Sequence, residues 1–156
     1  MKSMLSPVRD EHCLRCKGAG WLLGESPCSA CNRSGRVSRR TRVYVAGPLG
    51  KPDVIGLDGV AANVRRAAEA AIKLVAAGFA PMVPHHNADW PGAWDYPHNV
   101  WMEIDLSWVS MADILVRLPG HSPGADMEVA HAKMCGIPVY ELATWETLVG
   151  VEKTLV

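Results

Sequence analysis

The sequence predicts an α/β fold preceded by a small cysteine-rich module. Short apolar runs alternate with segments of helical periodicity from residue 42 onward, Gly and Pro separate them, and four of the five cysteines lie near the N-terminus. Alternating strands and helices favour a parallel sheet between two layers of helices. The predicted fold class is therefore α/β, a flavodoxin/Rossmann-like three-layer parallel sheet with a small N-terminal zinc-ribbon-like module.

The N-terminal cysteines form two CxxC pairs, Cys13-x2-Cys16 and Cys28-x2-Cys31, with eleven residues between them. This spacing fits one tetrahedral zinc ion held by four thiolates, and the glycines after each pair permit tight turns around the metal. A redox pair or two disulfides is the alternative. We predict a four-cysteine zinc knuckle over residues 1–38, with zinc in a structural role. The fifth cysteine, Cys135, is expected to be a buried apolar residue.

Composition and charge indicate one main domain with a basic appendage. The 156 residues are 49% hydrophobic and 21% charged, as in ordinary globular proteins. Residues 1–42 carry nine Lys/Arg and three Asp/Glu (+6), whereas residues 43–156 carry seven and thirteen (−6). The basic N-terminus is compatible with a nucleic-acid partner. We expect a cytoplasmic protein without a membrane partner, because the sequence contains neither a signal-peptide apolar region nor a membrane-length apolar run.

The first half of the main domain predicts a strand, a helix and a second strand. The apolar run that begins at Arg42 predicts the first strand, and a helix follows from Asn63 to Ala77. Asn63 is a suitable cap and Gly78 a stop signal. Residues 80–84 predict a short strand whose prolines favour an edge position. The helix is expected to pack through the apolar stripe Val64, Ala67, Ala68, Ala71, Ile72 and Val75.

The second half predicts two more strands, each preceded by a helix. In the first helix Ile104, Trp108 and Met111 share one face. A buried strand over residues 112–118 leads through a Gly/Pro turn into a helix that Gly136 ends, and residues 137–140 form the last strand. Residues 144–153 predict a terminal helix.

This order places Glu128 in the first turns of a helix, near the carboxyl end of a strand. Open α/β sheets bind ligands at that edge, and a helix N-terminus favours an ionised carboxylate. Acidic residues are also common in the first turn of a helix simply because the helix dipole favours them. The position of Glu128 therefore leaves a purely structural role open. A charged carboxylate beside a crevice can attack an electrophilic carbon, which makes Glu128 a candidate nucleophile.

Three motifs extend this hypothesis: Asp105-x-x-Trp108-Val109-x-x-Ala112-Asp113, then Ser122-x-Gly124-x-x-x-Glu128, and the opening strand Arg42-Val43-Tyr44-Val45-Ala46-Gly47-Pro48-Leu49-Gly50. Together they resemble the nucleoside 2-deoxyribosyltransferase superfamily, most closely its 2′-deoxynucleoside 5′-monophosphate N-glycosidase branch. The resemblance covers roughly residues 42–142 and implies a catalytic domain over residues 42–156. It also implies a homodimer, because active sites in this family are completed by a neighbouring subunit.

The resemblance implies roles for individual residues. Glu128 would attack the anomeric carbon of the sugar, Asp105 would hold sugar hydroxyls or protonate the leaving base, and Ser122 would bind phosphate. The loop after the first strand lacks the serine and arginine of the hydrolase branch, and Lys51 is the nearest cation. The other expected substrate-binding residues are Tyr44, Gly47, Pro48, Gly124, His85 and Trp90.

Residues 85–99 form a long segment rich in aromatic and histidine side chains. We interpret it as a lid that stacks on the nucleobase, with Trp90 among the stacking residues. Packing of a subunit interface is the alternative. A metal site made of His85, Asp89 and His98 is a weaker reading, since these residues lack tight ligand spacing.

The sequence thus predicts an enzyme that hydrolyses the N-glycosidic bond of a (deoxy)nucleoside 5′-monophosphate through a glutamate nucleophile. Such a reaction needs a carboxylate at the sugar and a proton donor at the base, which the two acidic residues would supply. One alternative is a nucleoside 2-deoxyribosyltransferase, in which a second base replaces water. A different class of alternative is a nucleic-acid-binding or nucleotide-sensing module without catalysis.

Overall fold

The computed structural model describes residues 8–22 and 26–142. The terminal helix predicted at residues 144–153 lies outside this part of the chain. Within these described ranges, no helix combines the length and apolar character needed to cross a bilayer.

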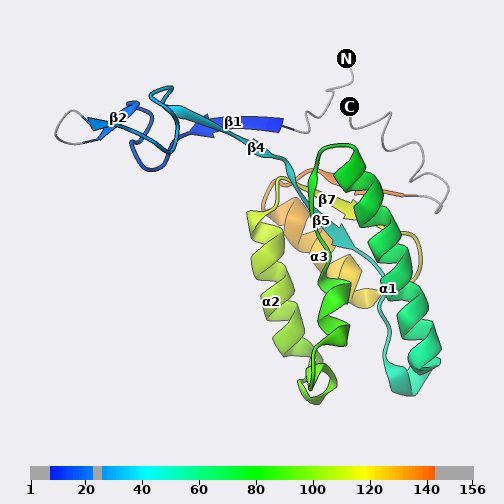
Figure 1. The fold of residues 1–156 in the computed structure, drawn as a ribbon. Coiled ribbons are helices and arrows are strands. Elements are labelled where there is room, and N and C mark those ends of the chain that lie inside the picture. The colour runs from blue at the N-terminus through cyan, green and yellow to red at the C-terminus, as the bar shows by residue number, and fades with distance from the viewer. Residues whose placement is uncertain (1–7, 23–25, 143–156) are drawn as a thin grey trace.

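A four-stranded parallel sheet forms the centre of the main domain (Figure 1). Its strands are β5 (Arg42–Ala46), β6 (Ala80–Met82), β7 (Ile114–Arg117) and β8 (Val139–Glu141), in the spatial order β6-β5-β7-β8. The register pairs Val43 with Pro81 and with Ile114. The prediction of a parallel sheet is confirmed, and the proline-containing strand β6 lies at an edge as expected, where a missing backbone N–H costs least.

Helices cover both faces of this sheet. The helix α1 (Pro52–Ala76) packs on one face, where it forms a buried cluster with alternate residues of β5 and β7. The helices α2 (His98–Met111) and α3 (Pro123–Met134) pack on the other face around Tyr44 and Leu115. Two 3-10 helices, η1 (Pro84–Asp89) and η2 (Ala93–Asp95), connect β6 to α2.

The helix predicted from Asn63 begins eleven residues earlier, at Pro52, with a kink at Gly56 where φ is +72°. Asn63 does not cap it, because the Asn63 side-chain amide donates to the Leu49 carbonyl at 3.1 Å. Gly78 does follow its end, at φ +89°. The predicted stripe was wrong in part, since Ile72 and Val75 are exposed. The buried face is instead made of Val60, Ala67, Ala70, Ala71 and Leu74. Small residues occur on every side of this helix, so periodicity alone does not show which side faces the core.

One apolar face of α2 is exposed. Ile104, Trp108 and Met111 share one face of α2, but they are 37%, 46% and 55% exposed, and α2 packs inward through Met102 and Val109. This helix has two apolar stripes, and only the neighbouring elements decide which one is buried.

Cys135 is exposed rather than buried. It caps the carboxyl end of α3, where the helix leaves the sheet, and its Sγ lies 3.6 Å from His131 Nε2. Helical periodicity does not hold a residue at the end of a helix against the core. The apolar character of Cys135 therefore did not predict its burial.

The cysteine-rich module is carried on a two-stranded arm that projects from the main domain (Figure 1). The strand β1 (Val8–His12) pairs antiparallel with β4 (Arg36–Arg40), and β4 runs through Thr41 into β5. The strands β2 (Trp21–Leu22) and β3 (Ser26–Pro27) form a second small ladder near the cysteines.

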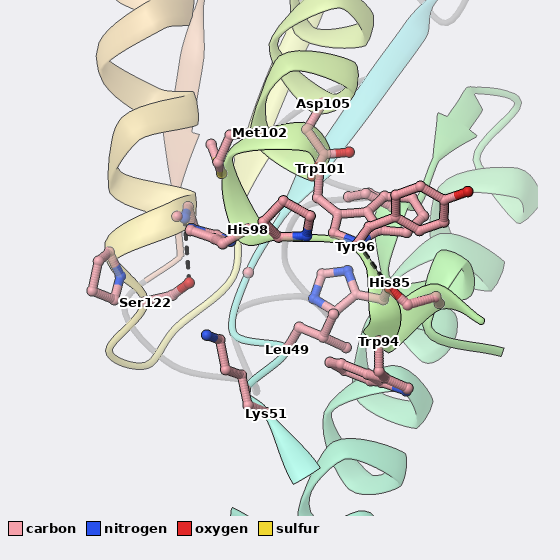
Figure 2. Close-up of a pocket in the computed structure, with 18 of the residues that line it drawn as sticks. Leu49, Lys51, His85, Trp94, Tyr96, His98, Trp101, Met102, Asp105 and Ser122 are labelled. Atoms are coloured by element: carbon pink, nitrogen blue, oxygen red, sulfur yellow. Dashed lines mark hydrogen bonds between the residues drawn. The ribbon is translucent and has the colours of Figure 1, made fainter. Parts of the chain in front are cut away.

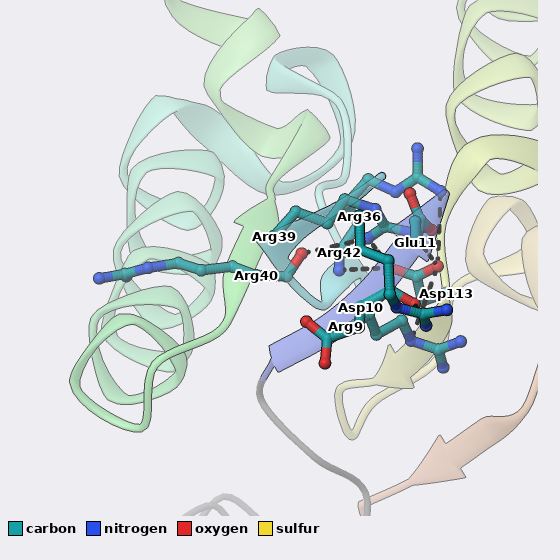
Figure 3. Close-up of polar contacts among 8 residues, drawn as sticks. All are labelled: Arg9, Asp10, Glu11, Arg36, Arg39, Arg40, Arg42 and Asp113. Atoms are coloured by element: carbon teal, nitrogen blue, oxygen red, sulfur yellow. Dashed lines mark hydrogen bonds and ion pairs between the residues drawn. The ribbon is translucent and has the colours of Figure 1, made fainter. Parts of the chain in front are cut away.

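Asp113 anchors the arm to the main domain (Figure 3). Arg39 forms an ion pair with both carboxylate oxygens of Asp113, and the backbone N–H of Arg42 donates to the same group at 2.7 Å. Burial opposes ionisation, but these donors lower the pKa of Asp113 well below its usual range. Arg42 and Asp113 lie at the amino ends of β5 and β7, so the arm joins the sheet at the edge opposite the carboxyl ends of the strands.

Candidate active site and metal centre

A cavity of about 920 Å³ lies at the carboxyl edge of the parallel sheet (Figure 2). Its lining comes from the segments that follow β5, β6 and β7, and from the inner face of α2. The expected site residues Gly47, His85, Asp105, Ser122, Gly124 and Glu128 all line it. The chain therefore brings together residues separated by up to 81 positions in sequence.

Glu128 lies on the second turn of α3 and is buried, with 5% of its surface exposed. The hydroxyl of Tyr44, on β5, donates to Glu128 Oε1 at 2.8 Å. Tyr44 is fully buried, so this bond fixes the carboxyl against the sheet. Tyr44 does not line the cavity itself, and it contacts the site through Glu128.

Asp105 on α2 is the second carboxyl of the site. One of its oxygens, Oδ1, is buried without a hydrogen-bond partner in the described part of the chain. Burial raises the pKa of Asp105 to about 6, and the Tyr44 hydroxyl opposes this shift. Burial also raises the pKa of Glu128 to about 8, with Tyr44 lowering it and the Asp105 charge raising it further. The two carboxyls therefore have different pKa values at one site, a pattern common in acid–base chemistry.

The N-terminus of α3 forms one end of the cavity. Ser122 is its N-cap residue, and its hydroxyl oxygen accepts from the Ala125 N–H at 3.2 Å. Arg117 holds the preceding turn by donating to the Gly120 carbonyl at 2.9 Å and by an ion pair with Asp126 at 3.0 Å. In Figure 2 the Lys51 side chain lies on this side of the cavity with Ser122.

His85 is 2% exposed and contacts the loop after β5. Its Nε2 lies 3.1 Å from the Pro48 carbonyl, which can only accept, so Nε2 carries the proton and Nδ1 is an acceptor. Nδ1 has no partner among the described residues. Burial lowers the pKa of His85 to about 4, so the ring is neutral. Pro48 thus supports His85 and does not line the cavity.

Three aromatic residues, Trp94, Tyr96 and Trp101, line the cavity at another end (Figure 2). Trp101 Nε1 donates to the Ala93 carbonyl at 3.0 Å, and its ring meets that of Tyr96 edge to face at 6.1 Å. Trp90, the expected stacking residue, does not line the cavity and packs against Trp101 instead. The sequence reasoning missed Trp101, although its spacing of four residues from Asp105 places both on one helix face.

The second candidate site is a cluster of four buried cysteines, Cys13, Cys16, Cys28 and Cys31. Their sulfurs lie within 4.8 Å of one another, with Sγ–Sγ distances of 3.8 Å for Cys13–Cys28 and 3.7 Å for Cys16–Cys31. A tetrahedral ion with metal–sulfur bonds of about 2.3 Å places its ligands about 3.8 Å apart, whereas a disulfide needs about 2.05 Å. The donor set and spacing therefore fit one metal ion.

Two glycines allow the cysteine pairs to approach each other. Gly20 and Gly35 have φ values of +78° and +71°, and an added Cβ would lie 2.2 Å from the Arg33 carbonyl oxygen and 2.1 Å from that of Gly18. The Gly20 N–H also points to Cys16 Sγ at 3.2 Å. Any side chain at these two positions would force the two CxxC turns apart.

The fold and the cavity define an α/β protein with a buried and a half-buried carboxyl at the carboxyl edge of a parallel sheet. The chain matches no protein-family model, and a comparison with curated proteins finds no match.

Proposed function

We propose that this protein is an enzyme that cleaves the N-glycosidic bond of a nucleotide. The observation that carries the proposal is the pair of carboxyls, half-buried Asp105 and buried Glu128, which line a ligand-sized cavity, with Tyr44 of β5 hydrogen-bonded to Glu128 behind it. The strand order also supports it, since β6-β5-β7-β8 is the flavodoxin-like order 2-1-3-4. The order reverses between β5 and β7, where such sheets bind nucleotides.

The proposed reaction assigns one step to each carboxyl. Tyr44 holds Glu128 Oε1, which leaves the other carboxylate oxygen to attack the anomeric carbon as the bond to the base breaks. Asp105 gives its proton to the departing base, so the reacting form is the minor one of the two singly protonated forms, with Glu128 ionised and Asp105 protonated. Water then hydrolyses the sugar ester and regenerates Glu128. If a second base takes the place of water, the same intermediate gives a deoxyribosyltransferase.

The pH dependence of this reaction tests which carboxyl acts as the nucleophile. With a neutral nucleoside, kcat/KM should rise through pH 6 and fall through pH 8, because one carboxyl must be ionised and the other protonated. A nucleoside is preferable here, since a phosphate titrates near pH 6 itself. This bell-shaped pH profile is the same whichever of the two carboxyls is the nucleophile, so the wild-type profile alone does not identify it.

The Asp105→Asn variant separates the two assignments. We expect slower turnover that increases with pH through the pKa of Glu128 and then stays high, because only the ionisation of the nucleophile remains in the profile. The measurement is the residual rate of base release at pH values from 5 to 9, with the free base detected by chromatography. Activity that decreases with rising pH would make Glu128 the acid and contradict its assignment as nucleophile.

The preference for 5′-monophosphates is proposed from the N-terminus of α3. There, the Ser122 hydroxyl and the helix dipole favour an anion, and Lys51 adds a positive charge on the same side of the cavity. Ser122→Asp should raise the KM for monophosphates at least tenfold more than for nucleosides, because it adds a negative charge while keeping a capping oxygen.

A panel of nucleosides and matching 5′-monophosphates, with free base detected by chromatography, tests both the reaction and this preference. Equal or better cleavage of the unphosphorylated nucleosides by the wild type would overturn the monophosphate preference alone. If no compound released a base, the N-glycosidase proposal itself would fail.

We propose zinc as the metal of the four-cysteine cluster, with a structural role. Four thiolates in a tetrahedral arrangement are typical of structural zinc and leave no open position for substrate. The cluster lies on the arm, which joins the sheet at the edge away from the cavity. We propose a homodimer as well, for which the exposed face of α2 made of Ile104, Trp108 and Met111 is a suitable surface.

A second candidate function, binding of single-stranded nucleic acid, is favoured by one feature of the arm. Trp21 is half-exposed, and the Arg33 guanidinium lies 5.1 Å from its ring centroid. An exposed aromatic ring beside cations can stack a base while the cations contact phosphates. Salt-dependent binding of an oligonucleotide without any base release would favour this function over the enzyme.

A further inference from the structure

We propose that the base of the substrate is positively charged, as in a pyridinium or an N7-alkylated purine nucleotide. This inference rests on the proposed N-glycosidase function and names its substrate class. It is carried by the distribution of charged and aromatic side chains around the cavity.

The lining of the cavity has an excess of carboxyl groups. Asp53, Asp95, Asp105 and Glu128 line it, and Lys51 is the one Lys or Arg among its described lining residues, beside the imidazoles of His85 and His98. Even with Glu128 protonated at neutral pH, three carboxylates remain. His85 adds no positive charge because its buried ring is neutral. Carboxylates without matching cations favour a cationic ligand over a neutral one.

The aromatic residues lie where such a cation would be bound. Trp94 and Tyr96 are 44% and 61% exposed, and with Trp101 they present rings to the cavity. The faces of aromatic rings attract cations, most strongly for Trp. Asp95, between Trp94 and Tyr96 in sequence, lines the same cavity and has no ion pair among the described residues.

Lys51 and Ser122 lie at a different end of the cavity from these rings (Figure 2). The positive and hydroxyl-bearing end suits a phosphate, and the aromatic end suits a cationic base. A nucleotide that carries both charges would complement both ends at once. The cavity volume of about 920 Å³ is ample for such a ligand.

An independent observation indicates that a ligand completes this site. His85 is almost fully buried, lines the cavity, and has a ring nitrogen, Nδ1, without a partner in the described part of the chain. Buried polar atoms are normally hydrogen-bonded, and an N–H or O–H of the substrate would satisfy this acceptor.

A cationic base also simplifies the chemistry. As the carboxylate of Glu128 forms its bond to the anomeric carbon, the carbon–nitrogen bond breaks and its electron pair passes to the base nitrogen. That pair cancels the positive charge, so the base leaves neutral and needs no proton. Water then attacks the anomeric carbon and releases Glu128. The products are the neutral base, the sugar phosphate and one proton.

The test compares 7-methylguanosine 5′-monophosphate with guanosine 5′-monophosphate, which differ in one methyl group and one positive charge. Nicotinamide mononucleotide serves as the pyridinium probe. Since cationic nucleosides are intrinsically labile, affinity is measured by calorimetry on the Glu128→Gln protein, and wild-type base release is corrected for that of the same variant. We expect the cationic nucleotides to bind at least tenfold more tightly than guanosine 5′-monophosphate.

Variants at the aromatic end assign this preference to the proposed residues. Asp95→Asn and Trp94→Ala should each reduce the preference severalfold, whereas Asp89→Asn, an exposed aspartate outside the cavity, should leave it unchanged. Thermal unfolding shows whether each variant is folded. Equal or tighter binding of the neutral nucleotide, together with release of neutral bases, would overturn this inference and leave the proposed function standing. Absence of base release from every compound would overturn both.

Discussion

Replacement of Glu128 by glutamine should lower kcat by at least about a thousandfold, which corresponds to about 4 kcal/mol of transition-state stabilisation. The amide lacks the nucleophilic carboxylate but keeps an oxygen that accepts the hydrogen bond from Tyr44. The site should therefore stay folded and still bind nucleotides. The measurement is base release under saturating substrate, together with nucleotide affinity. Turnover close to that of the wild type would remove Glu128 from the mechanism.

The same variant has a stability readout that does not depend on substrate. The pKa of Glu128 in the folded protein, about 8, lies above its ordinary value of 4.5, so the fold favours the protonated form. The stability that this protonation contributes is present below about pH 4.5 and is lost as pH rises to 8. Glutamine is neutral throughout, so its Tm should exceed that of the wild type by several degrees at pH 9 and differ little at pH 4. Glu103→Gln, on the exposed side of α2, is the matched control and should show neither effect.

Replacement of Cys28 and Cys31 by serine should remove the metal and unfold the N-terminal module. In the described part of this module, the buried residues are the four cysteines and two glycines, so the module has almost no hydrophobic core of its own. Binding of structural zinc to small modules contributes about 10–16 kcal/mol of apparent free energy, which nothing else here replaces. Elemental analysis should find one zinc per wild-type chain and none in the variant, and limited proteolysis should cleave the variant within residues 1–38.

Catalysis should largely survive this change, because the arm joins the sheet at the edge opposite the cavity. Cys135→Ser provides the control, since it removes an exposed cysteine outside the cluster and should leave the zinc content at one per chain. A wild-type protein without metal whose four thiols are free and whose N-terminus is ordered would contradict the zinc assignment.

The features that depend on local order along the chain could be predicted from the amino-acid sequence. Apolar runs predicted the strands β5, β6, β7 and β8, and the prolines predicted the edge position of β6. The CxxC spacing predicted a cluster of four cysteines. The strand–turn–helix pattern predicted that Glu128 follows β7 on the first turns of α3. Each of these follows from residues within about twenty positions of one another.

Which helix faces are buried and which distant residues meet depends on the packing of the whole domain. Periodicity placed Ile104, Trp108 and Met111 on one face of α2, but the side of α2 that packs on the sheet depends on α3 and β5. The bond between Tyr44 and Glu128 joins residues 84 positions apart, and it exists because parallel strands place their carboxyl ends at one edge.

The aromatic end of the cavity shows the same limit. Residues 85–99 are rich in aromatic side chains, but Trp94 and Tyr96 line the cavity and Trp90 does not, since the 3-10 helices η1 and η2 set the direction of these rings. Short 3-10 turns have no sequence period that fixes side-chain direction in advance. The pKa values of Asp105 and Glu128 likewise follow from burial, which only the packed elements around them provide.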